Sequence, residues 1–161
     1  MKKIIILTIM IQFFLSCNKE SSQKDNIVED EVTTGSYYMK DFLDEEKKMG
    51  LSTKILKEGD TLSYKELKEI YFLSNYTKEF LSYSMVMSHD YNYDLAYFDT
   101  YLILRNFATS NENIRTNKLA DYYLLKAYEL SPKKMNSAMK ERFGKNLPKI
   151  KAEDYWKLIN R

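Results

Sequence analysis

The chain contains few of the residues that interrupt helices or build covalent and metal sites. Its 161 residues include four glycines, two prolines, one cysteine and one histidine. A single cysteine cannot form an internal disulfide, and it has no second thiol for a cysteine-based zinc site. Glycine-rich phosphate loops, paired-cysteine motifs and the HExxH pattern are also missing. Because chain breakers are so rare, their positions carry information about the boundaries of helices.

The apolar run near the start of the chain is too short to cross a bilayer. Residues 4–15 are mostly apolar and follow Lys2 and Lys3, whereas a membrane-spanning helix needs about twenty residues. The pattern fits a signal peptide, with a charged start, an apolar stretch and the small Ser16 before the cut. The alternatives are a buried N-terminal helix of a cytosolic domain and an uncleaved anchor. We predict that residues 1–16 are removed.

The tetrapeptide Phe14-Leu15-Ser16-Cys17 resembles a bacterial lipobox. The usual pattern has leucine third and a small residue second before the cysteine. The looser form here is similar to that of Bacteroidetes-type lipoproteins. The resemblance implies cleavage between Ser16 and Cys17 and acylation of the Cys17 thiol. Acyl chains bind a bilayer with about 0.8 kcal/mol per buried methylene group, so the lipid bilayer is one expected partner.

The residues after the cysteine indicate which membrane would hold the protein and how its domain would be attached. In enteric lipoproteins an aspartate at the next position favours retention in the inner membrane. Asn18 stands there, so the resemblance implies an outer-membrane anchor, on the periplasmic side or at the cell surface. Residues 17–35 are polar and without period, and we interpret them as the lipidated cysteine and a flexible tether. Residues 36–161 remain for one domain with its own core.

The apparent basicity of the chain comes from the predicted signal peptide. The full sequence has 25 basic and 23 acidic residues, but residues 1–16 hold two lysines and no acid, so the mature chain has no net charge. This balance argues against a nucleic-acid partner. Residues 131–161 nevertheless carry nine bases and three acids. That basic end suits an acidic partner or anionic lipid headgroups, or it is a solvated helical surface.

The pattern of the mature chain predicts an all-α domain, a compact bundle of about five to six helices, because no alternating strand pattern appears. A capping box at Ser63, with Leu62 and Leu67 as its hydrophobic staple, predicts the start of the second helix. Gly50 should end the first helix, and residues 53–56 could be extended. The predicted helices are 37–49, 64–88, 93–108, 111–130 after a cap at Ser110, 132–144 after Ser131-Pro132, and a short one after Pro148.

Residues 120–132 resemble the second helix of a tetratricopeptide repeat. Ala120, Leu124, Ala127 and Pro132 occupy the small, large, small and proline positions of that pattern. The preceding helix fits only roughly, and no second copy follows 34 residues later, although stacked repeats need about three units. The resemblance therefore implies antiparallel packing of one helix pair rather than a solenoid.

The stretch "SHDYNYD", residues 88–94, contains the only histidine, His89. Serine, histidine and aspartate are neighbours there, but a catalytic triad requires a spatial arrangement and not adjacency. The stretch also resembles the start of an EF-hand loop, yet Leu95 and Tyr101 stand where glycine and glutamate are needed. We expect no catalytic residue, no metal ligand and no cofactor.

The chain is rich in aromatic residues, with fourteen tyrosines and eight phenylalanines. Tyrosine is common at protein interfaces, because a rigid ring is joined to a polar tip. Tyr91 and Tyr93, in a predicted turn between helices, are our candidate partner-binding residues. The alternative is that the rings form the core and that the composition reflects an AT-rich genome.

We therefore predict a non-catalytic, membrane-anchored envelope lipoprotein that binds another protein. The helices of residues 64–130 resemble immunity proteins of type VI secretion amidases, which are small, exported and helical, although the paired cysteines of that family are absent. The resemblance implies an immunity or inhibitor protein acting against a secreted toxin. The alternative is a structural or assembly accessory of an outer-envelope complex.

Replacing the lipidation site tests the predicted anchor. Cys17→Ala should abolish palmitate labelling and cleavage before residue 17, because the acylated thiol directs both. Labelling of cells with palmitate, followed by membrane fractionation, measures the two effects. Unchanged labelling together with continued membrane attachment would contradict the lipoprotein interpretation.

Overall fold

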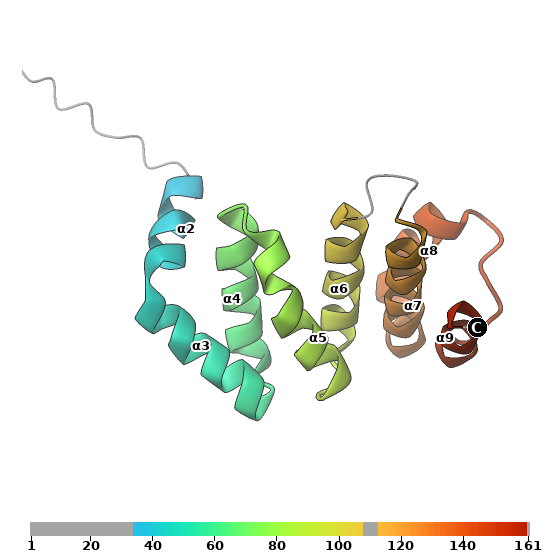
Figure 1. The fold of residues 1–161 in the computed structure, drawn as a ribbon, viewed down its shortest axis with the longest axis horizontal. Coiled ribbons are helices and arrows are strands. Elements are labelled where there is room, and N and C mark those ends of the chain that lie inside the picture. Colours follow the sequence, from blue (N-terminus) through green and yellow to red (C-terminus); the bar gives the residue numbers. More distant parts are fainter. Residues whose placement is uncertain (1–33, 108–112, 161) are drawn as a thin grey trace, which may run out of the picture. The chain divides into compact units, whose positions relative to one another are not determined.

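The computed structural model describes residues 34–107 and 113–160, which form eight α-helices and one 3₁₀ turn and contain no strand (Figure 1). The all-α prediction is confirmed, but the number of helices is eight rather than five or six. In order they are α2 (Thr34–Leu43), α3 (Glu45–Glu58), α4 (Thr61–Leu73), the 3₁₀ turn η1 (Thr77–Phe80), α5 (Leu81–His89), α6 (Asp94–Phe107), α7 (Ile114–Leu130), α8 (Pro132–Phe143) and α9 (Ala152–Ile159).

The prediction for the first helix is wrong at its C-terminal end. The Asp44 carboxylate accepts the Lys47 backbone N–H at 2.9 Å and begins a separate helix, α3, that runs straight through Gly50. The segment expected to be extended is helical, and Ile55 within it is completely buried. An internal glycine costs only about 1 kcal/mol relative to alanine. The Asp44 cap and the burial of Ile55 outweigh that cost.

The predicted helix from 64 to 88 begins earlier and is divided in two. Asp60, not Ser63, is the N-cap of α4, and its carboxylate accepts the backbone N–H groups of Leu62 and Ser63 at 3.3 and 2.9 Å. Leu62 is 72% exposed, so the predicted hydrophobic staple does not form. After α4, Asn75 adopts a left-handed conformation with φ 67°. The resulting bend turns the chain so that Phe80 is fully buried.

The predictions for the C-terminal half largely agree with the structure. Helices α6, α8 and α9 lie where the pattern placed them, with Pro132 in the first turn of α8 and Gly144 directly after its end. Helix α7 begins later than predicted, at Ile114 with Asn113 as its N-cap, rather than at residue 111. Ser131 does not cap α8 with its side chain, because its hydroxyl donates to Asp94 Oδ2 at 2.5 Å. Ser110, the signal peptide, Ser16, Cys17 and the tether up to residue 33 lie outside the described residues.

Helix α6 separates two hydrophobic clusters. On one side Tyr97, Tyr101 and Leu104 pack with α7, α8 and the start of α9. On the other side Ala96 and Ile103 pack with α3, α4 and α5. The two clusters account for most of the fully buried apolar side chains, so α6 contributes to both parts of the core.

Helices α6 and α7 pack side by side and antiparallel (Figure 1). The Asn113 side chain donates to the Phe107 carbonyl at 3.1 Å, which places the end of α6 beside the start of α7. Further along both helices, the rings of Tyr97 and Tyr123 lie 6.1 Å apart. The small residues of the repeat-like pattern, Ala120 and Ala127, are completely buried. The antiparallel packing that the repeat resemblance implied is therefore present.

Replacement by alanine should have opposite effects on stability at Gly50, inside α3, and at Gly59, directly after its end. Gly59 has φ 66°, and a β-carbon there would lie 2.2 Å from Tyr91 Cδ1, whereas nothing lies within 4 Å of the corresponding position at Gly50. Gly59→Ala should lower the free energy of unfolding by about 1–3 kcal/mol. Gly50→Ala should raise it by about 0.4–1 kcal/mol. Urea unfolding followed by circular dichroism measures both changes, and a stabilising Gly59→Ala would contradict the described turn.

Candidate functional site

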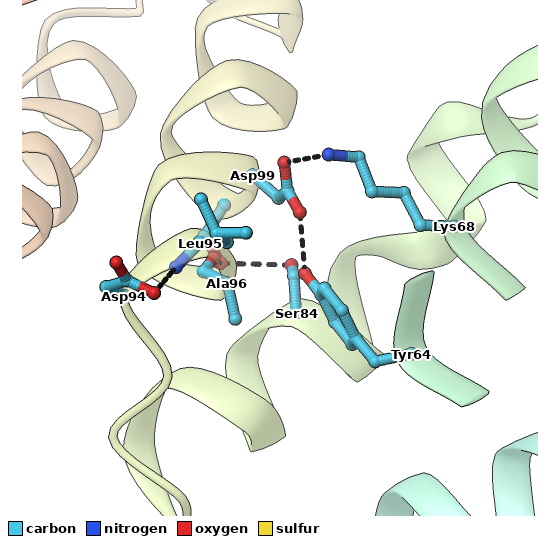
Figure 2. Close-up of polar contacts among 8 residues, drawn as sticks. Tyr64, Lys68, Ser84, Asp94, Leu95, Ala96 and Asp99 are labelled. Atoms are coloured by element: carbon cyan, nitrogen blue, oxygen red, sulfur yellow. Dashed lines mark hydrogen bonds and ion pairs between the residues drawn. The ribbon is translucent and has the colours of Figure 1, made fainter. Parts of the chain in front are cut away.

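The most deeply buried acid of the described chain is Asp99 on α6, which is 1% exposed. Figure 2 shows its carboxylate between two donors from α4, the Tyr64 hydroxyl at 2.9 Å and the Lys68 ammonium at 2.6 Å. Burial raises the pKa of Asp99 above its usual value, and Lys68 and Tyr64 oppose that rise. Burial and the neighbouring Asp99 also raise the pKa of Tyr64 far above its usual value. Tyr64 therefore remains a hydrogen-bond donor.

Asp99 joins helix α6 to helix α4 through these two contacts. The hydroxyls nearest to it along the α5–α6 contact are already paired (Figure 2). Thr100 Oγ1 lies 2.9 Å from both Ser84 Oγ and the Ala96 carbonyl, and Ser84 Oγ donates to the Leu81 carbonyl at 2.9 Å. The arrangement stabilises the packing of α4 and α5 on α6.

The residues of the "SHDYNYD" stretch do not form a triad. The Ser88 hydroxyl donates to the Met85 carbonyl at 2.8 Å. The imidazole Nε2 of His89 instead lies 2.8 Å from the hydroxyl of Tyr123 on α7, and Asp90 is exposed. Across residues 34–107 and 113–160, no group of three or more histidine, cysteine or acidic side chains could hold a metal ion.

Tyr91 and Tyr93 lie in the turn between α5 and α6, as predicted, but they differ in exposure. Tyr91 is 37% exposed, and its hydroxyl donates to the Leu56 carbonyl at 3.1 Å. Tyr93 is half-buried, with its ring edge-on to Tyr64 at 5.5 Å. Both rings thus contact the α3–α4 region, and their predicted role in partner binding stays a prediction.

A groove between α7 and α9 is the strongest candidate site of the described chain, and sequence reasoning did not find it. Its volume is about 510 Å³. We call it the α7–α9 groove. Its lining residues are Arg115, Lys118 and Leu119 from the first turns of α7 and Trp156, Ile159 and Asn160 from the end of α9. The two groups are some forty positions apart in sequence, so the fold alone brings them together.

Polar contacts with α7 hold α9 in place. The first backbone N–H of α9, from Ala152, donates to the Glu129 carboxylate at 2.8 Å, and this contact caps a helix that has no side-chain cap of its own. The other contacts are an ion pair between Lys126 and Glu153 at 2.5 Å, the Tyr155 hydroxyl 3.5 Å from Asp121, and the Trp156 ring 5.0 Å from that of Tyr122. Helix α9 therefore forms a defined second wall of the groove.

The lining of the groove contains two cations and no acid, whereas two acids stand beside two lysines in the hollow along α3. Arg115 and Lys118 are exposed, and neither has an acidic partner within the described part of the chain. In the hollow of about 480 Å³ along α3, by contrast, Lys47 pairs with Asp41 at 2.8 Å and Glu66 at 3.0 Å. Trp156, the single tryptophan, is 41% exposed beside the two cations. The α7–α9 groove thus combines unpaired positive charge with apolar surface.

Comparison with known proteins assigns no family to the chain. No family model matches it, no curated protein matches it, and no solved structure matches it. None of the helices that the structure describes has both the length and the apolar character to cross a bilayer.

The pH dependence of stability tests the contact between Lys68 and Asp99. Because the pKa of Asp99 is raised by folding, the folded chain holds this proton to a higher pH than the unfolded chain. The contribution of Asp99 to stability is therefore greatest at low pH and declines as the pH rises through its folded pKa. Lys68 limits this decline by pairing with the carboxylate.

Lys68→Met should therefore lower the free energy of unfolding by about 1–3 kcal/mol at neutral pH, and the deficit should shrink on acidification. The matched control is Lys65→Met, an exposed lysine of the same helix, which should change the free energy by less than about 0.5 kcal/mol. Urea unfolding at a series of pH values measures both. A Lys68→Met deficit that did not vary with pH would contradict the role of Lys68.

Proposed function

We propose that this protein is a lipid-anchored envelope protein that binds another protein, without catalysis, through the α7–α9 groove. The observation that carries the proposal is the position of Trp156 opposite two unpaired cations in an open groove. Tryptophan and arginine are the residues that most often dominate the energetics of protein interfaces. Interior polar groups such as Asp99 and Ser84 are buried in contacts between helices. The charged groups of the groove are exposed and can contact a partner.

The predicted anchor gives the proposed binding a location. Cys17 would be acylated and inserted in the outer membrane, and the described domain begins at Thr34, so a short segment would connect the two. A protein held this way meets partners confined to the same membrane or passing it, and confinement raises their effective concentration. An anchored binding domain therefore needs only modest intrinsic affinity.

Two versions of this function differ in the partner. In the first, the protein is an immunity or inhibitor protein that occupies a secreted toxin, and a neighbouring gene for an exported toxin would favour it. In the second, the protein is a structural or assembly accessory, and co-purification with a stable envelope complex would favour it. The open groove with a central aromatic residue supports binding in both versions.

Site-specific crosslinking in cells tests the proposed function. A photoreactive amino acid in place of Asn160 should give a discrete protein adduct, because this exposed position lines the groove beside the two cations. The same substitution at Lys65, an exposed lysine on α4, should not, and the same substitution at Tyr91 tests the other predicted contact. The adducts are detected by electrophoresis and identified by mass spectrometry.

The Asn160 adduct should also disappear when Cys17 is replaced by alanine, since binding depends on location. If neither Asn160 nor Tyr91 gave an adduct above the Lys65 background, the protein-binding function would be wrong. Identification of a toxin or of an envelope complex in the adduct decides between the two versions.

A further inference from the structure

The two cations of the α7–α9 groove are placed to act together on one ligand. Arg115 and Lys118 are three residues apart on α7, so their side chains leave the same face of the helix about 5–6 Å apart at Cβ. Like charges at this spacing oppose helix formation, and no described acid compensates them. A ligand that supplies carboxylates between them would remove that repulsion.

The opposite wall offers a different kind of contact. Trp156 and Ile159 of α9 face the groove together with Leu119 of α7. The Trp156 indole also rests on the buried ring of Tyr122, which holds it in one orientation. A rigid ring of this kind accepts an aliphatic or aromatic side chain at little conformational cost.

We propose that the α7–α9 groove binds an acidic segment of the partner protein, with two carboxylates paired to Arg115 and Lys118 and an apolar side chain against Trp156. This inference rests on the proposed protein-binding function and specifies the chemistry of the partner. The charge of the C-terminal part supports it, because residues 131–161 have nine bases against three acids. An excess of positive charge in this part of the chain favours association with negative segments.

The shape of the site favours a protein segment over a membrane surface. The cations lie on one wall and the indole on the other, so a ligand must enter between two helices to reach both. A peptide chain can do so, whereas a flat layer of headgroups meets only the rims. A lipid surface is therefore the competing outcome in the test.

The test is a selection from a random peptide library, performed with the full chain purified in detergent. Peptides that combine at least two acidic residues with an aromatic or aliphatic residue should be enriched. Because the chain has one tryptophan, and it lines the groove, its fluorescence then measures the affinity of each selected peptide. Binding should weaken as the salt concentration rises, since the contacts are exposed ion pairs.

Charge reversal provides the decisive comparison. Arg115→Glu with Lys118→Glu should weaken the selected acidic peptides about tenfold or more and shift a new selection toward basic peptides. The matched control is Lys133→Glu with Lys140→Glu on α8, which changes the net charge equally at two exposed lysines outside the groove. The control should retain the original preference and affinity within about twofold.

Three outcomes would overturn the inference. Selection of apolar peptides without acidic residues, or equal loss in both double variants, would show that the groove does not recognise carboxylates. Binding of phosphatidylglycerol vesicles that depends on Arg115 and Lys118, without acidic-peptide binding, would assign the groove to lipid. In each case a specific crosslink from residue 160 would leave the proposed function standing, whereas the absence of adducts from both residue 160 and residue 91 would remove that function as well.

Discussion

Helix α6 is buried on two sides, and the arrangement of the whole domain depends on that burial. One side contributes Tyr97 and Leu104 to the cluster formed with α7, and the other contributes Ile103 to the cluster formed with α4 and α5. The second side also carries Asp99, whose carboxylate would be costly to bury alone. Its two donors come from a single helix, α4, so the position of α4 on α6 is specified by polar geometry as well as by apolar contact. Helix α7 packs on α6, and α9 packs on α7. The position of the α7–α9 groove therefore depends on α6.

The all-α class and the C-terminal helices were predictable because local chemistry marks them strongly. The Ser131-Pro132 pair and Gly144 enclose α8, and the spacing of Ala120, Leu124 and Ala127 defines the buried face of α7. The N-terminal half was predicted less well because its signals compete. Asp60 and Ser63 are both good N-cap residues three positions apart, and tertiary burial of Ser63 and its neighbours decides between them. Gly50 looked like a helix end, but the true end is Gly59, where the left-handed backbone and the Tyr91 ring both require glycine.

The candidate site could not be predicted from sequence, because its two walls come from segments that are remote along the chain. The excess of basic residues in 131–161 includes the segment that forms α9, yet both groove cations belong to α7, outside that range. The aromatic argument selected Tyr91 and Tyr93 by their place in a turn. The structure packs Tyr93 against Tyr64 and leaves Trp156 more exposed. A ring at a predicted turn can close the turn as readily as it can face a partner, and spacing alone does not distinguish the two.

The attachment of α9 has a consequence for dynamics. Of its side chains only Ala152 is fully buried, and the contacts that hold it to α7 are largely polar, through Glu129 and Glu153. Few buried apolar contacts are characteristic of segments that open locally without global unfolding. Detachment of α9 would remove one wall of the groove, so the groove exists only while α9 is packed on α7. A ligand that spans both helices would then slow the hydrogen exchange of the α9 amides, and the closing of this helix becomes part of the free energy of recognition.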